Sequence, residues 1–212
     1  MKISISHDLY MKMARTHHLA PVIIFGSLSL LQTLAAIVWG GFSPAKMILL
    51  YLAGFCMWTV VEYVLHRFPF HYVTEKEPLR LLTGGLHLLH HEIPNRGDYV
   101  VSPILLSTPF YLLISGLLYL ITKNIFSTAL FMAGLALAYL CYEWVHYSTH
   151  HRVAKTSFGK YLKRHHMMHH FKDSQNYFGV TSPFWDWMFG TLPKNDEQRD
   201  TTILPILSRE PG

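Results

Sequence analysis

Residues 125–151, IFSTALFMAGLALAYLCYEWVHYSTHH, decide the fold that we expect, because an apolar run leads directly into a histidine motif. The run over 125–145 has the roughly 20 mostly apolar residues that a helix needs to span a bilayer. Its one charged residue, Glu143, lies one helical turn before His146. A carboxylate inside a membrane span is a functional candidate by default. The stretch therefore predicts a membrane helix that ends at a functional site.

Three further stretches meet the same length requirement, at about 19–39, 45–65 and 101–121. Half of the 212 residues are hydrophobic, which is high for a soluble protein of this size. Residues 1–18 are polar and lack the short apolar core and cleavage site of a signal peptide, so we expect the first span to be retained. The sequence thus predicts an all-α integral membrane protein with about four transmembrane helices, in which residues 19–212 form one domain after an N-terminal segment.

Four spans place the N-terminal segment, residues 67–100 and the tail from His146 on one side of the bilayer. Of the 18 Lys and Arg residues, only Lys46 and Lys123 fall in the two opposite loops. The positive-inside rule then predicts that the histidine-bearing side is cytoplasmic. The net charge of +5 reflects this topology rather than binding to nucleic acid. The absence of a dilysine or KDEL-type signal favours a bacterial inner membrane over the endoplasmic reticulum.

Twelve of the 15 histidines lie in four short motifs on the predicted cytoplasmic side. The motifs are HRFPFH at 66–71, HLLHH at 87–91, HYSTHH at 146–151 and HHMMHH at 165–170. Residues at i, i+3 and i+4 share one face of a helix, so each H-x-x-H-H directs its imidazoles into one region. A shuffled chain of this composition would hold roughly 0.07 copies of H-x-x-H-H. Two copies therefore indicate a site, whereas the isolated His7, His17 and His18 are expected to be solvated.

About ten imidazoles suit two metal ions rather than one, because one zinc or iron ion takes four to six ligands. Imidazole binds Zn, Fe, Cu and Ni alike, so the ligand type leaves the metal open. A ligating imidazole usually donates its other N–H to a carboxylate or carbonyl. Glu62 and Glu143 lie at helical spacings before His66 and His146 and are the first candidates for that role. The weaker candidates are Glu92, Asp98, Asp173 and Asp186.

Five stretches between residues 58 and 191 carry a family resemblance, namely EYVLHRFPFH (62–71), HLLHH (87–91), HYSTH (146–150), HHMMHH (165–170) and FGVTSPFWDWMFGT (178–191). They resemble the fatty acid hydroxylase and sterol desaturase superfamily of membrane di-iron oxygenases, and are most similar to the fatty acid 2-hydroxylases. The resemblance implies a cytoplasmic histidine-rich helical cap that holds a dimetal site, with no catalytic residue separate from the ligands. The implied ligands are His66, His71, His87, His90, His91, His146, His150, His166, His169 and His170.

The resemblance also implies how these ligands divide between two ions. One ion would be held by His66, His71, His87, His91 and His166. The other would be held by His90, His146, His150, His169 and His170. His151 and His165 fall outside the implied ligand pattern.

The implied reaction is hydroxylation of a lipid acyl chain, at carbon 2, by two iron ions that use O₂ and two electrons. Zinc can replace iron after purification. The chain contains no cytochrome b5 domain, so we expect a separate electron donor such as cytochrome b5, ferredoxin or a reductase. Candidate contacts for the lipid head are Arg67, Tyr72, Tyr99 and Tyr177. The aromatic residues Trp185, Trp187 and Phe189 are expected to anchor the chain at the membrane interface.

Three alternatives remain open from the residues alone. The same scaffold could hydroxylate or desaturate a sterol or a carotenoid. A membrane zinc hydrolase would need a water-activating site and no electron donor. A metal transporter would place ligands along a path near the bilayer midplane, whereas these motifs cluster past the ends of the predicted helices.

Overall fold

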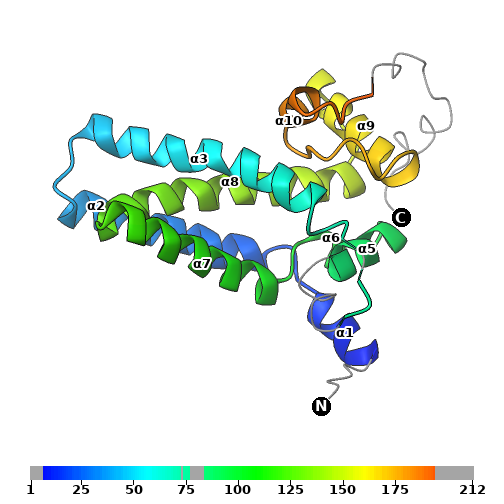
Figure 1. Cartoon of the computed structure of the whole chain (residues 1–212), viewed down its shortest axis with the longest axis horizontal. Coiled ribbons are helices and arrows are strands. Elements are labelled where there is room, and N and C mark those ends of the chain that lie inside the picture. The colour runs from blue at the N-terminus through cyan, green and yellow to red at the C-terminus, as the bar shows by residue number, and fades with distance from the viewer. Residues whose placement is uncertain (1–6, 73, 77–83, 194–212) are drawn as a thin grey trace.

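The computed structural model describes residues 7–72, 74–76 and 84–193, and every regular element among them is a helix. Four of its helical stretches are long and apolar enough to cross a membrane, and they run side by side along the long axis of the molecule (Figure 1). They are Val22–Trp39, Pro44–Arg67, Gly97–Thr122 and Ile125–His151. The prediction of an all-α protein with four membrane helices is confirmed.

These stretches correspond to labelled elements. The first is a π-helical turn, η1 (Val22–Gly26), followed by α2 (Ser27–Trp39). The second is α3 (Pro44–Arg67), the third comprises the short α6 (Gly97–Val100) and α7 (Ile104–Thr122), and the fourth is α8 (Ile125–His151). Helices α3 and α8 extend past the predicted spans, so their histidines lie on the helices themselves.

Helix α8 is the centre of the bundle, because 61% of its apolar window is buried against at most 22% in the other three. It packs closely on α3 at two facing glycines. A Cβ atom on Gly54 would overlap the carbonyl oxygen of Phe131, and one on Gly134 would overlap that of Tyr51. Small residues at such crossings let two membrane helices approach each other. The α3–α8 pair is therefore the frame that fixes where their histidine-bearing ends lie.

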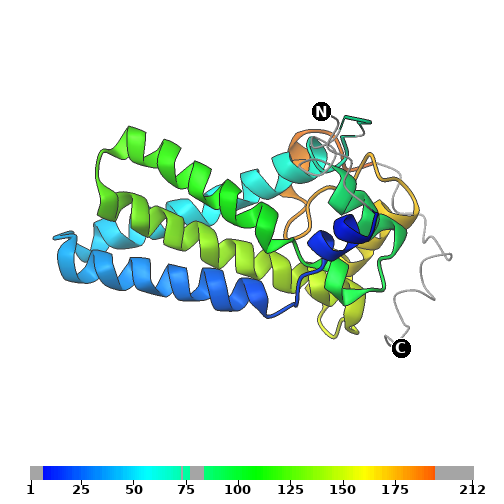
Figure 2. The ribbon, with the colours of Figure 1, turned by 90° about the horizontal axis from the view of Figure 1, so that it is seen from below.

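The remaining helices gather at one end of the bundle, at the ends of α3 and α8 that carry histidines (Figures 1 and 2). These helices, which together with the loops beside them form the cap, are α1 (His7–Ala14), α5 (Gly84–Glu92), α9 (Ser157–Phe171) and α10 (Phe184–Met188). Helix α9 begins where Thr156 caps it, with the Thr156 hydroxyl accepting from the Gly159 N–H at 3.0 Å. All four histidine motifs thus lie at one end of the molecule.

Two of the isolated histidines, His17 and His18, lie between α1 and η1. His17 and His18 are exposed and stack on each other, with ring centroids 4.5 Å apart. The side chain of His7 is outside the described part of the structure. His18 also stacks on Tyr147 of the HYSTHH motif, with ring centroids 5.4 Å apart, but neither histidine belongs to a group of described residues that could hold a metal ion.

Candidate metal centre

The ten histidines expected to bind metal lie in two groups of five, and within each group the ligand nitrogens lie within 4.8 Å of one another. The first set is defined as His66, His71, His87, His91 and His169. The second set is defined as His90, His146, His150, His166 and His170. The cap and the ends of α3 and α8 thus bring four distant motifs into two adjacent donor clusters.

Within each set the Nε2 atoms face one another. The distance from His66 Nε2 to His87 Nε2 is 3.0 Å, and that from His146 Nε2 to His90 Nε2 is also 3.0 Å. A metal–imidazole bond of about 2.1 Å brings ligands at right angles to about 3 Å from each other. Both sets therefore have the donor type and spacing that fit a transition-metal ion.

The two sets follow a simple helical rule. Histidines at i and i+4 serve the same set, as His166 and His170 do, whereas a histidine at i+3 serves the other set, as His169 does. The predicted division is therefore wrong for His166 and His169, which exchange places. The physical reason is that successive side chains of a helix are rotated by about 100° around its axis. The side chain at i+4 therefore projects about 40° to one side of residue i, and the side chain at i+3 about 60° to the other side.

Burial and mutual repulsion keep the cap imidazoles neutral. Burial lowers the pKa of His71 to about 4. Burial, together with the neighbouring His71, lowers the pKa of His91 to about 4. For His166, burial and then the charge of His170 lower the pKa well below its usual value. Neutral imidazoles offer a lone pair, which is the form that a metal cation binds.

Two imidazoles of the first set are oriented by backbone carbonyls. His66 Nδ1 donates to the carbonyl of Phe178, and His169 Nδ1 donates to the carbonyl of Asn176 at 2.7 Å. A carbonyl can only accept a hydrogen bond, so the proton lies on Nδ1 and the lone pair on Nε2. This is the tautomer that turns Nε2 towards the centre of the set.

Among the described residues, neither Glu62 nor Glu143 forms a hydrogen bond to an imidazole, which corrects the prediction for both. Glu62 accepts hydrogen bonds from the backbone N–H groups of Val180 and Thr181, at 2.7 and 2.8 Å. Glu143 accepts from the backbone N–H of Ser102 at 3.1 Å. Loop N–H groups buried beside apolar helices need an acceptor from the protein, and these carboxylates provide it.

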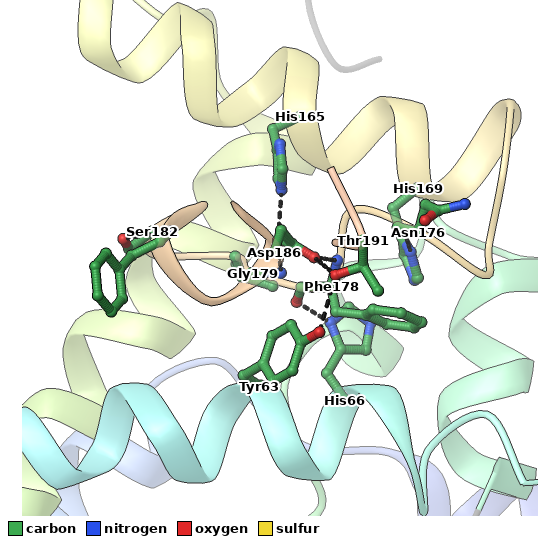
Figure 3. Close-up of polar contacts among 12 residues, drawn as sticks. Tyr63, His66, His165, His169, Asn176, Phe178, Gly179, Ser182, Asp186 and Thr191 are labelled. Atoms are coloured by element: carbon green, nitrogen blue, oxygen red, sulfur yellow. Dashed lines mark hydrogen bonds and ion pairs between the residues drawn. The ribbon is translucent and has the colours of Figure 1, made fainter. Parts of the chain in front are cut away.

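The carboxylate that supports the histidines most directly is Asp186, which the sequence ranked among the weaker candidates. Its side chain is fully buried, and it accepts from His165 Nε2 at 3.0 Å (Figure 3). The other weaker candidates do less: Asp98 pairs with Arg96, and Asp173 caps the turn that holds Asn176. A lone aspartate inside the aromatic sequence FWDWMF was the available signal, because such a charge requires buried partners.

An apolar cavity of about 270 Å³ lies between η1, α3, α7 and α8, lined by residues such as Trp58, Phe110 and Leu135. A smaller cavity of about 30 Å³ is lined by His87, His90 and His146. The two cavities share the lining residues Phe70, Ser102, Leu106 and Tyr142. An apolar space inside the membrane bundle therefore adjoins histidines of both sets.

The predicted contacts to the lipid head are only partly available. Tyr99 and Tyr177 are 4% and 1% exposed, so neither lies on an open surface, although Tyr99 lines the smaller cavity. Arg67 donates to Tyr63 Oη at 2.9 Å, and Tyr72 is exposed.

The aromatic residues in α10 and directly after it lie at the molecular surface. Trp187 and Phe189 are more than half exposed. Trp185 is partly buried, and its indole N–H donates to the Thr59 hydroxyl at 3.1 Å. Exposed aromatic side chains near a helix end suit the interfacial role expected for them.

Comparisons with known proteins agree with this site. The family described as Fatty acid hydroxylase matches residues 51–191. A dihydroceramide fatty acyl 2-hydroxylase of Arabidopsis thaliana is 35% identical over 140 residues, covering 66% of this chain and 59% of that protein. A ceramide very long chain fatty acid hydroxylase of Saccharomyces cerevisiae is 38% identical over 149 residues, covering 67% of this chain and 37% of that protein.

The fold has a solved counterpart as well. A structure of full-length scs7p, in which only the hydroxylase domain is visible, matches with a TM-score of 0.71 and 30% identity, over 85% of this chain and 68% of that chain. The family match contains all ten clustered histidines and Asp186. The sequence match, the shared fold and the two histidine sets lead to one conclusion: this chain belongs to the fatty acid hydroxylase family.

Proposed function

We propose that this protein is an O₂-dependent oxidoreductase that hydroxylates a membrane lipid acyl chain at carbon 2. The observation that carries the proposal is the apolar cavity inside the bundle, which adjoins histidines of both sets through shared lining residues. A long hydrocarbon chain is the ligand that such a cavity favours, because burying its methylenes there removes them from water. A water-activating zinc hydrolase has no need of this arrangement.

The two sets of histidines would hold two iron ions. When bound, iron supplies redox chemistry with O₂ that oxidises an unactivated carbon–hydrogen bond. The neutral imidazoles of the cap support this assignment, since each can present Nε2 to a cation without first losing a proton.

The protein's own side chains would position the substrate and exclude water. The ring of Phe70 stacks on His87, with centroids 5.2 Å apart, and it lines both cavities. Tyr142 lines both cavities too and lies against His146, with ring centroids 5.5 Å apart. These two aromatic rings would guide the acyl chain towards the histidines and shield the reacting carbon from solvent.

Hydroxylation at carbon 2 follows from the direction in which the acyl chain of the substrate would lie. With the hydrocarbon tail in the larger cavity, the polar head remains at the cap, and only carbons close to the head reach the histidine sets. The relatives from Arabidopsis thaliana are named as fatty acyl 2-hydroxylases, which supports the same position. The acyl group can belong to a free fatty acid or to a larger lipid, and product analysis separates the two.

The reaction needs two electrons from a separate donor, and we include a cytochrome b5, a ferredoxin or a reductase in the proposal. The donor would approach the cap from the cytoplasm, where the positive-inside rule places the Lys- and Arg-rich side of the chain. A bacterial inner membrane is the location that we propose.

The test is product analysis in membranes that contain the protein and a competent reductase. Fatty acids deuterated at carbon 2 and isotopically heavy oxygen gas should yield 2-hydroxy acyl products that have lost one deuterium and gained one heavy oxygen atom. Membranes containing His146→Ala serve as the matched control and should give none. Hydroxylation elsewhere on the chain, or product formation under strict anaerobiosis, would contradict the proposal.

A further inference from the structure

We infer that Asp186 is a positioning residue for the first histidine set, and that it acts through the loop over 176–180 rather than by touching a ligand. The inference rests on the proposed function, because it assumes that the first set holds a metal ion. Figure 3 shows Asp186 between His165, the loop and Thr191, with His66 on the other side of the loop. Asp186 is fully buried, so its charge needs several donors.

Both carboxylate oxygens of Asp186 are fully used. Oδ1 accepts from the Phe178 N–H at 2.8 Å and from the Thr191 hydroxyl at 2.7 Å. Oδ2 accepts from the Gly179 N–H at 2.7 Å and from His165 Nε2 at 3.0 Å. Four donors arranged around one carboxylate fix its orientation and hold the loop against α9 and α10.

The loop passes this constraint to His66 through a single peptide plane. The Gly179 N–H and the Phe178 carbonyl belong to the same planar peptide unit. Asp186 binds the N–H end of that unit, and His66 Nδ1 donates to its carbonyl end. A change at Asp186 would therefore tilt the acceptor that orients His66.

A second peptide plane repeats the arrangement for His169. The Asn176 carbonyl accepts from His169 Nδ1, while the Tyr177 N–H of the same unit donates to the Thr191 carbonyl at 3.0 Å. Thr191 is held in turn by Asp186, both through its hydroxyl and through its backbone N–H, which donates to the Asp186 carbonyl at 2.8 Å. Asp186 thus supports both imidazoles of the first set that have a backbone acceptor.

The loop backbone adopts a conformation that these contacts must maintain. Tyr177 has a φ of 61°, a left-handed value that costs free energy for a residue with a side chain. A Cβ on Gly179 would overlap the Ser182 carbonyl and approach Asp186 Oδ2. The loop therefore depends on Asp186 for its shape, and Gly179 allows the carboxylate to come close.

The test compares Asp186→Asn with the wild type after both are loaded with iron(II) under anaerobic conditions. Asparagine has the size of aspartate but carries an N–H₂ donor in place of one acceptor oxygen. That N–H₂ group would face the donors that now bind Asp186, so hydrogen bonds to the loop or to His165 would be lost. We expect one ion per chain to be released to a chelator about 10- to 100-fold more readily, the usual effect of losing a group that orients a ligand. In Mössbauer spectra, one of two iron signals should change and the other should not.

Three further variants make the result specific. His165→Leu removes a donor to Asp186 and should reproduce part of the change, whereas His165→Gln keeps an N–H donor and should restore wild-type release. Asp98→Asn, the same substitution at a carboxylate paired with Arg96, should leave both ions unaffected. If Asp186→Asn cannot be purified folded, Thr191→Val removes one donor and should give a smaller change in the same iron signal.

The outcomes separate the inference from the proposed function. A wild type that binds fewer than two ions per chain would overturn the proposed two-iron site. A wild type with two ions, together with an Asp186→Asn variant that has unchanged release and an unchanged spectrum, would overturn only the role of Asp186. An equal effect on both iron signals would also overturn it, because general loss of structure would explain that result.

Discussion

The two histidine sets use the same ligand type but are supported differently. In the first set, His66 and His169 donate from Nδ1 to loop carbonyls. In the second set, the Nδ1 atoms of His90, His146, His166 and His170 are buried, and none has a hydrogen-bond partner in the part of the chain that the structure describes. The first set is thus oriented by a loop, whereas the second relies on the helices that carry it.

The difference follows from which imidazoles reach the loop over 176–180. Every member of the second set is on a helix, namely α5, α8 or α9, and a helix backbone limits the directions of its side chains. His66 and His169 also lie on helices, α3 and α9, but their Nδ1 atoms meet loop carbonyls, so the loop fixes these two rings in addition. The comparison teaches that changes to the loop over 176–180, or to the residues that hold it, should affect one ion selectively.

The largest effect is expected from removing a ligand from each set in turn. His166→Ala should abolish metal binding at the second set, and His169→Ala should abolish it at the first. Each substitution removes an imidazole ligand that alanine cannot replace. Each variant should hold one ion per chain and lose hydroxylation by about 100-fold or more, above the usual effect of losing an orienting partner. Metal analysis with Mössbauer spectra checks this. Loss of the same iron signal in both variants would show that the grouping is wrong.

Gly179→Ala should have the next largest effect, confined to the first set. The added methyl group would overlap the Ser182 carbonyl and push the loop away from Asp186. We expect about 1–3 kcal/mol of destabilisation from this crowding and about 10- to 100-fold weaker retention of one ion. Thermal unfolding in detergent and chelator release measure the two effects.

Gly116→Ala is the matched control, because a Cβ on Gly116 meets nothing within 4 Å. It should retain both ions and unfold at the same or a slightly higher temperature, since Ala is favoured over Gly in a helix. A Gly179→Ala variant that behaves like this control would show that the loop tolerates the displacement.

Glu62→Gln and Glu143→Gln compare a carboxylate that holds the loop of the first set with one that does not, and their effects should be smaller than that of Gly179→Ala. Glu62 holds the loop at Val180 and Thr181, whereas Glu143 holds Ser102. Leaving a buried donor without its acceptor should lower stability by about 1–3 kcal/mol in each variant. Only Glu62→Gln should also speed release of the ion of the first set, which chelator kinetics would detect. Selective release from the second set in Glu62→Gln would contradict the assignment of the loop.

The smallest effect is expected from Asp173→Asn. Asp173 accepts from the Asn176 side chain at 2.7 Å and so supports, from a distance, the carbonyl that orients His169. Loss of one partly exposed hydrogen bond costs about 1 kcal/mol, which corresponds to roughly a fivefold faster release of one ion. An effect as large as that of Asp186→Asn would show that the turn over 173–176, rather than Asp186, holds the loop.

Local regularities made much of this protein predictable from its sequence. The length of apolar runs predicted the four membrane helices, and histidine spacing predicted a cluster of about ten imidazoles. The family resemblance implied which ten residues these are. Helical spacing also contains the division between the two sets, because the i, i+4 rule that pairs His87 with His91 pairs His166 with His170.

Contacts between distant segments decided the rest. Glu62 lies one helical turn before His66, yet its partners are Val180 and Thr181, and Asp186 reaches back to His165. The sequence by itself determined which residues form the bundle and where imidazoles cluster, because hydrophobicity and helical period act over a few turns. Only the tertiary structure decided which carboxylate serves which loop, because a hydrogen bond forms only where folding brings donor and acceptor within about 3 Å.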